Sequence, residues 1–225
     1  MDLDFLSSVS IFSDLSDSEL SNIQSLCKTR KYPKNSMIIL EEEMGDVVFI
    51  VMTGTVKITR VNDEGKEVIL AMLGSGEVFG EMAILDGESR SANALAQENC
   101  EVVTINREDF LNVIKTNNKV AINLMTEFAI RLRKSDQQIE ALSLDDAEHR
   151  IGVSILNLAE EMGVIRKGVV TVDNLPYQQD IANMAGTSRE TVSRVMKIFE
   201  DRGLITKTGH KLSIPDYAFF KRIFG

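Results

Sequence analysis

The spacing of apolar residues changes character within the first 143 residues of the 225-residue chain. Residues 5–30 carry short helical patterns, and Ser16 with Glu19 three positions later is the signature of a capping box. Residues 31–105 show alternation or short apolar runs, separated by turn residues such as Gly54 and Gly65. Many short strands at this spacing predict a small antiparallel sandwich or roll. The expected strands lie within residues 37–40, 47–52, 56–59, 68–73 and 102–105.

From about residue 107 the pattern becomes helical and remains so to about residue 143. Seven positions alternate by four and three: Ala121, Met125, Phe128, Leu132, Ser135, Ile139 and Leu142. Such a seam without Gly or Pro predicts a coiled-coil dimer interface. The alternative is a helix that packs only on its own domain.

The third part of the chain begins at a break in this seam. Residues 143–146, Ser-Leu-Asp-Asp, predict a hinge and a cap for an amphipathic helix over 147–162, followed by a strand over 168–172. A short helix that ends at Gly186 and a second helix capped by Thr187 or Ser188 have the pattern of a helix-turn-helix. Residues 204–214 then predict a β-hairpin, or wing, with His210 at its solvated tip.

The second helix of this motif has side chains suited to DNA. Arg189, Glu190 and Arg194 share one face, where Arg can contact guanine and Glu can accept from cytosine. The opposite face is apolar and should pack inward. The alternative for an Arg-Glu pair is a solvated surface ion pair. Further DNA contacts, mainly to phosphates, are expected from Gln179, Ser188, Thr191, Ser193, Lys197, Lys207 and Lys211.

The distribution of charge agrees with this division. The formal net charge is −9, but the first 145 residues hold 14 basic and 24 acidic side chains, whereas residues 146–225 hold 11 and 10. Such asymmetry indicates a regulatory part and a part that faces nucleic acid. The acidic N-terminus and the absence of a long apolar run predict no export and no membrane partner. Cys27 and Cys100 are expected as small core residues of a cytoplasmic protein, with no metal site.

Residues 79–92 carry a second group of candidate binding residues. Arg90 offers a permanent charge and a planar donor fork for a phosphate, and Glu81 could accept from a ribose hydroxyl. Gly80, Ala83 and Ser91 are small, so that backbone N–H groups can approach an anion closely. This combination predicts a site for a cyclic phosphodiester and its sugar.

Over roughly residues 10–216 the chain resembles the CRP/FNR family of bacterial transcription regulators. The resemblance rests on the following segments: residues 45–46, Gly54, residues 63–67, the stretch that begins at 79–81 and ends at 90–92, and residues 188–192. It implies an α+β architecture with a jelly-roll-like cyclic-nucleotide-binding β-roll over 1–115, a coiled-coil dimerisation helix over 116–143, and a winged helix-turn-helix over 144–225. The implied partners are a second copy of the chain, palindromic double-stranded DNA, a cyclic nucleotide as allosteric ligand rather than cofactor, and RNA polymerase.

The resemblance also assigns ligand contacts. Residues that match Gly80, Glu81, Arg90 and Ser91 hold ribose and cyclic phosphate in the family's cAMP-binding members, and Arg131 matches a position near the pocket. The family's adenine-contacting Thr-Ser pair aligns with Ser135 and Asp136. A carboxylate at 136 can accept from the adenine amino group but repels the guanine carbonyl, which favours cAMP over cGMP. The remaining expected contacts are Ile58, Leu70, Leu73, Met82 and Ala83.

Other functions stay open at this point. A regulator of the same family could respond to cGMP or cyclic di-GMP, or bind DNA without ligand. A cyclic-nucleotide-binding module of an enzyme or channel would explain residues 79–92 but not residues 178–214. The sequence contains no Ser/His/Asp group, no metal-ligand set and no P-loop, so we do not expect an enzyme.

Overall fold

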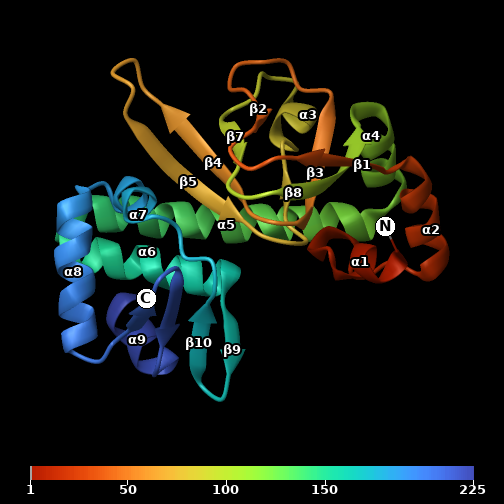
Figure 1. The fold of residues 1–225 in the computed structure, drawn as a ribbon. Helices are drawn as coiled ribbons and strands as arrows, with labels where there is room; N and C mark the ends of the chain where they lie inside the picture. Colours follow the sequence, from red (N-terminus) through yellow and green to blue (C-terminus); the bar gives the residue numbers. More distant parts are fainter. Residues whose placement is uncertain (1) are drawn as a thin grey trace. The chain divides into compact units, whose positions relative to one another are not determined.

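The computed structural model describes residues 2–225, which form two compact units. The first unit comprises the described residues up to Arg60 and Leu70–Arg133. The second comprises Lys134–Gly225 and also Val61–Ile69. The long helix α5 (Asn118–Leu144) runs without interruption through the boundary (Figure 1). The predicted three-part division at residues 115 and 143 remains a prediction.

Two four-stranded sheets build the roll, with strand orders β1-β8-β3-β6 and β2-β7-β4-β5. All strand pairs with a determined register are antiparallel, as expected for a roll. The strands are β1 (Lys28–Tyr32), β2 (Met37–Ile39), β3 (Val47–Thr53), β4 (Val56–Val61), β5 (Glu67–Leu73), β6 (Val78–Phe79), β7 (Asn93–Ala96) and β8 (Cys100–Asn106).

Strand β3 shows why a short continuous apolar run predicted a strand at this position. Val48 and Ile50 point to the core shared with the N-terminal helices and α5, whereas Phe49 and Val51 point to the core that includes residues of both sheets. Successive side chains of a strand face opposite sides, so a strand buried on both faces reads as a continuous apolar run. All five predicted strand segments are confirmed.

Helices of the first unit pack against the roll in a shared hydrophobic core. Ser16 caps α2 in a capping box with Glu19, as predicted. The predicted helical pattern from residue 107 is confirmed, and the structure divides it into two helices, α4 and α5, at Asn117. The helices before α5 are α1 (Leu3–Ser8), α2 (Asp17–Leu26), α3 (Met82–Asp86) and α4 (Arg107–Thr116), and a short 3₁₀ turn covers Ser10–Phe12.

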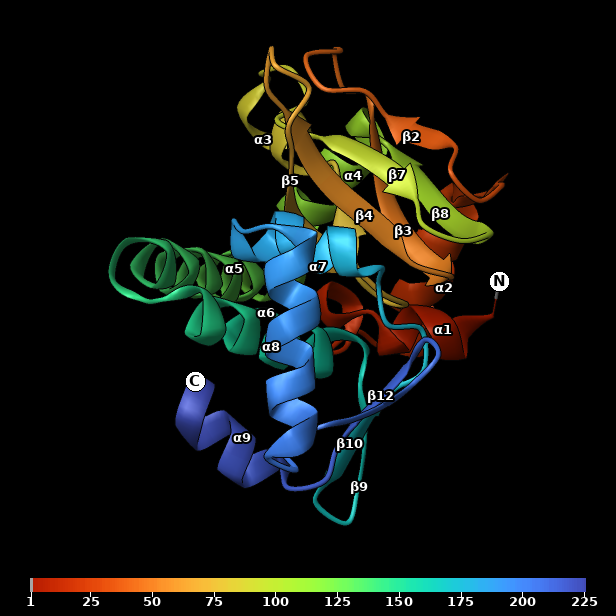
Figure 2. The same ribbon diagram turned by 60° about the vertical axis from the view of Figure 1, so that its left-hand side comes forward.

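The second unit contains the predicted winged helix-turn-helix (Figure 2). Asp146 caps α6 by accepting from the His149 N–H, and Gly186 adopts the left-handed conformation at the end of α7 (φ 58°). The wing hairpin joins a sheet of order β11-β12-β10-β9. The elements are α6 (Ala147–Met162), β9 (Val164–Arg166), β10 (Val169–Val172), α7 (Gln178–Ala185), α8 (Arg189–Asp201), β11 (Thr206–Thr208), β12 (Lys211–Ile214) and α9 (Tyr217–Phe224).

The seam of α5 is largely exposed in a single chain. Met125, Leu132, Ile139 and Leu142 are 61%, 63%, 59% and 49% exposed. Phe128 departs from the prediction, because it is half-buried against the core of its own roll. A row of exposed apolar side chains on one helix is typical of a helix that packs against another chain.

The two cysteines do not form a disulfide. Cys100 is buried, and Cys27 lies half-buried against the N-terminal core, where burial raises the pKa of its thiol to about 11. Within residues 2–225, no helix combines the length and the apolar character that a membrane span requires.

Candidate functional site

Arg90 lies in the first unit, hydrogen-bonded through its backbone to the loop that precedes β3. Its side chain donates to the backbone carbonyls of Gly80 and Val47, the latter at 2.7 Å, and stacks over the Phe49 ring. Only 7% of Arg90 is exposed. A guanidinium carries five N–H donors, and these two bonds use two of them. Arg90 can therefore hold the start of β3 and Gly80 in place and still donate to an anion.

Two glycines make room for this guanidinium. A Cβ on Gly45 would lie 2.7 Å from Arg90 Cζ, and a Cβ on Gly80 would lie 2.6 Å from Arg90 Nη1. Gly80 also has φ +74°, which favours glycine. Gly45 does not have a positive φ, so the conformational argument does not apply to it. Its lack of a side chain instead leaves room for the side chains of Arg90 and Ala83.

Three carboxylates act electrostatically on the buried charge of Arg90. Burial lowers the pKa of Arg90, while the carboxylates of Asp46, Glu81 and Glu43 raise it. A guanidinium nevertheless remains protonated in proteins, so the site keeps a fixed positive charge. Such a charge with spare donors is suited to a phosphate.

Glu81 is the second predicted residue of this site and is 2% exposed. Arg131 on α5 donates to Glu81 Oε1 at 2.8 Å and to the Val78 carbonyl at 2.6 Å. Burial raises the pKa of Glu81, and the two arginines, Arg131 and Arg90, oppose that rise. The sequence placed Arg131 near the pocket but did not indicate its ion pair with Glu81.

The other expected ligand residues take different environments. Ala83 and Leu73 are buried, Ile58 is half-buried, and Leu70 is 46% exposed. Met82 and Ser91 are exposed and meet through a sulfur contact of 4.0 Å. Ser135 and Asp136 belong to the second unit, where both are exposed. The structure thus brings Gly80, Glu81, Arg90 and Arg131 together by direct contacts.

The predicted DNA-reading face is on α8. Val192, Met196 and Phe199 are buried, which turns the opposite face to solvent as predicted. The Ser188 hydroxyl caps α8 by accepting from the Thr191 N–H at 3.2 Å. The polar side chains border a shallow groove of about 580 Å³, lined by Gln178, Arg189, Glu190, Ser193, Arg194 and Lys197.

The Glu190 side chain is ionised and can accept hydrogen bonds. Its own backbone N–H and the Ser188 hydroxyl lower its pKa, so the side chain is ionised at neutral pH. Arg189 lies one position before it, at the first residue of α8. A donor fork and an acceptor side by side at the start of this helix can distinguish base edges in a major groove.

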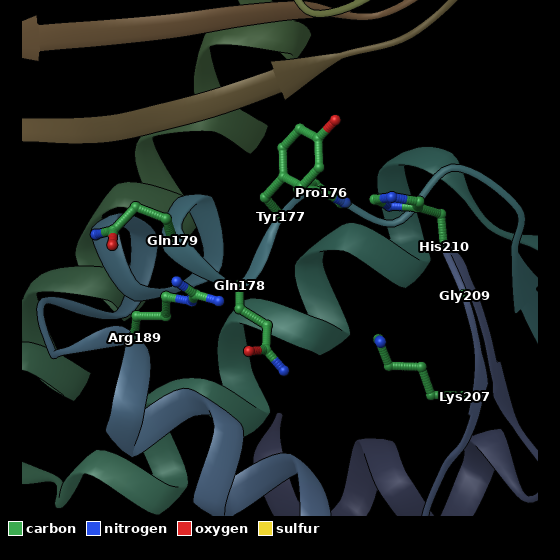
Figure 3. A pocket seen from close by; sticks show the side chains of 8 residues that line it. All are labelled: Pro176, Tyr177, Gln178, Gln179, Arg189, Lys207, Gly209 and His210. Atoms are coloured by element: carbon green, nitrogen blue, oxygen red, sulfur yellow. The ribbon is translucent and has the colours of Figure 1, made fainter.

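A second groove, of about 620 Å³, lies between α7 and the wing (Figure 3). Its lining includes three residues that were not among the predicted DNA contacts: Tyr177, Gln178 and His210. His210 is exposed as expected, but its Nδ1 lies 3.0 Å from the Leu175 carbonyl and its ring packs edge-on against Tyr177. Only the folded wing shows that Lys207 and His210 line the same groove as Arg189 and Gln179.

Two of the predicted phosphate contacts are engaged in ion pairs. Lys197 pairs with Asp201 at 2.9 Å, and Lys211 pairs with Asp173 at 2.8 Å. All four side chains are more than half exposed. Exposed pairs contribute about 0–1 kcal/mol, so a phosphate can displace these partners at low cost.

Comparison with known proteins assigns a domain family to each of the two regions that contain these residues. The model of the cyclic nucleotide-binding domain matches residues 29–117, and that of the Crp-like helix-turn-helix domain matches residues 149–223. The cyclic AMP receptor protein of Thermus thermophilus is 33% identical over 213 residues, which cover 95% of each chain. The cAMP-activated global transcriptional regulator CRP of Haemophilus influenzae is 32% identical over 192 residues, or 84% of each chain.

A solved structure shares the fold. That of FixK2 from Bradyrhizobium japonicum has a TM-score of 0.77 and 23% identity, and the match covers 88% of this chain and 98% of that one. The two domain matches and the cyclic AMP receptor protein relative show a transcription regulator, rather than an enzyme, with a cyclic nucleotide-binding domain and a DNA-binding helix-turn-helix. The chain therefore belongs to the CRP/FNR family of transcription regulators.

Proposed function

We propose that this regulator is a homodimer that binds palindromic DNA in response to cAMP. The observation that carries the proposal is Arg90, a buried guanidinium with spare donors that is held next to Glu81. A cyclic phosphate would accept from Arg90, and the ribose 2′-hydroxyl would donate to Glu81. Because Arg131 also binds Glu81, a ligand at this carboxylate would act on the long helix.

The choice of cAMP rests on two arguments. Two relatives above 30% identity are named for cAMP, and the matches cover 95% and 84% of this chain. Asp136 can accept from an adenine amino group, whereas it would repel the carbonyl of guanine. The alternatives are cGMP, cyclic di-GMP or activity without ligand.

The remaining parts of the proposal follow from the second unit and α5. The exposed seam of α5 would pair with a second copy, and the two copies of α8 would then contact half-sites about 34 Å apart. A DNA-bound regulator of this family would act in the bacterial cytoplasm, with RNA polymerase as a further partner.

Calorimetry with cAMP, cGMP and cyclic di-GMP tests the ligand. Wild-type protein should bind cAMP most tightly, and Arg90→Ala should lose at least tenfold in affinity, because each lost charge-assisted bond costs about 1.5–3 kcal/mol. Thermal unfolding of the free variant separates this loss from a loss of fold. An Arg90→Ala protein that binds cAMP as tightly as wild type would show that the pocket is assigned wrongly.

A further inference from the structure

The helix-turn-helix contains a short helix whose end needs partners from outside. In α7 the N–H groups of Gly186 and Thr187 both donate to the carbonyl of Ala182. The last carbonyls of a helix have no intrahelical partner and must be satisfied by other groups. For α7 these include the carbonyls of Met184, Ala185 and Gly186, directly before the turn that leads into α8.

Side chains from α5 and α6 meet these carbonyls. Arg150, on the first turn of α6, donates from Nε to Ala185 O at 2.8 Å and from Nη2 to Gly186 O at 3.5 Å. Gln138 of α5 donates to Met184 O at 3.4 Å. All of these residues lie within the second compact unit.

The same guanidinium also holds the end of the long helix. Arg150 Nη1 donates to Asp145 O at 2.8 Å, one residue beyond the end of α5. A positive charge near the C-termini of two helices is favourable, because the helix dipole places partial negative charge there. One side chain thus connects the ends of α5 and α7 while it belongs to α6.

Packing supports the same connection. A Cβ on Gly186 would lie 2.9 Å from Cδ2 of Leu142, so the last turn of α5 lies directly against the backbone of the turn. The bonds of Arg150 and the packing of Leu142 therefore act on one short segment. That segment ends two residues before Ser188, which caps the recognition helix.

We propose that Arg150 is a positioning residue for DNA reading, which holds the turn before α8 against the end of α5. The inference rests on the proposed function, because it concerns how the start of the recognition helix is held when DNA is bound. The proposal assigns Arg150 no contact of its own with a base. A lysine cannot replace it, because an ammonium on a flexible stem lacks the planar fork that reaches three carbonyls.

The test compares Arg150→Lys and Arg150→Gln with wild type and with Arg222→Lys. Arg222 is a matched control, since it is an exposed arginine of the same unit that stacks on Phe219 in α9. The DNA probe is a duplex selected by the wild-type protein from a random library in the presence of cAMP. Three quantities are measured: affinity for this duplex, affinity for cAMP, and amide hydrogen exchange of the full-length protein.

We expect both Arg150 variants to lose at least tenfold in affinity for the selected duplex, with cAMP affinity within twofold of wild type. Amides of residues 186–190 should exchange at least tenfold faster, while those of Val195 and Phe199 keep their protection. Arg222→Lys should change none of these quantities. Arg150→Lys should not restore the wild-type affinity that Arg150→Gln loses.

Two results would overturn the proposal. One is DNA affinity and exchange of both variants within twofold of wild type. The other is loss of protection throughout α8, which would mean that Arg150 merely keeps the domain folded. If wild-type protein selects no duplex with any cyclic nucleotide, the proposed function fails, but the exchange data still decide whether Arg150 holds the turn.

Discussion

Replacing Gly45 by alanine tests the geometry of the nucleotide site without removing any of its polar groups. The new Cβ would lie 2.7 Å and 2.8 Å from Cζ and Nε of Arg90, and 3.0 Å from Cβ of Ala83. Carbon atoms in contact prefer about 3.5–4.0 Å, so the guanidinium must move by roughly 1 Å. Overpacking of this kind costs about 1–3 kcal/mol.

The displacement should weaken cAMP binding. Arg90 would lose its alignment with the carbonyls of Gly80 and Val47, and with them the orientation that a phosphate requires. If most of this overpacking cost of about 1–3 kcal/mol destabilises the cAMP-bound state, cAMP affinity decreases by roughly tenfold or more. Calorimetry gives the affinity, and thermal unfolding gives the stability of each free protein.

Gly76→Ala serves as the control for this experiment. Gly76 has φ +88°, and the new Cβ would have the Ser8 carbonyl oxygen as its nearest neighbour, at 3.6 Å. The substitution therefore strains the backbone by about 1–2 kcal/mol without contact to Arg90. Its cAMP affinity should remain within twofold of wild type. If Gly45→Ala binds cAMP normally, or if both variants lose affinity equally, the role of Gly45 in placing Arg90 is refuted.

Three further predictions concern the recognition helix, the buried carboxylate and the seam. Glu190→Ala should relax specificity at one base pair by about 1–3 kcal/mol in binding to single-base variants of the selected duplex; an equal loss on every sequence would contradict base reading. Burial raises the pKa of Glu81, so its folded form holds a proton more strongly than its unfolded form. In denaturant titrations, the free energy of unfolding of wild type, measured relative to that of Glu81→Gln, should therefore fall as pH rises above 4.5, the ordinary pKa of a glutamate. A rise over this pH range would contradict the burial argument. Leu132→Asp should yield monomers in sedimentation velocity. Ile122→Asp, which alters a similarly exposed residue outside the seam, should remain a dimer. An unchanged dimer in Leu132→Asp would exclude the seam as the dimer interface.

The sequence predicted the elements that have a strong local pattern and missed those that depend on the rest of the fold. β3 and α8 follow from apolar periodicity and capping, which are local. β1 consists mostly of exposed polar residues, and β6 has only two residues, so neither produces a period. The break at Asn117 also has no Gly or Pro to mark it.

The same limit applies to the sites. The types of residue at Glu81 and Arg90 indicated a phosphate and sugar site, because a charge and an acceptor next to small residues are a local signal. Their partners are distant in sequence: Val47 lies 43 residues from Arg90, and Arg131 lies 50 residues from Glu81. Only the folded chain shows that Gly45 is small to accommodate Arg90 and that Arg150 joins the ends of two helices.

The central claim is that a ligand held by Arg90 controls reading of DNA by α8. It is tested most directly by titrating the selected duplex with wild-type protein and with Arg90→Ala, each with and without saturating cAMP. We predict that cAMP tightens DNA binding of wild type at least tenfold and leaves that of the variant unchanged. Equal DNA affinity of wild type with and without cAMP, or a full response in Arg90→Ala, would contradict the account.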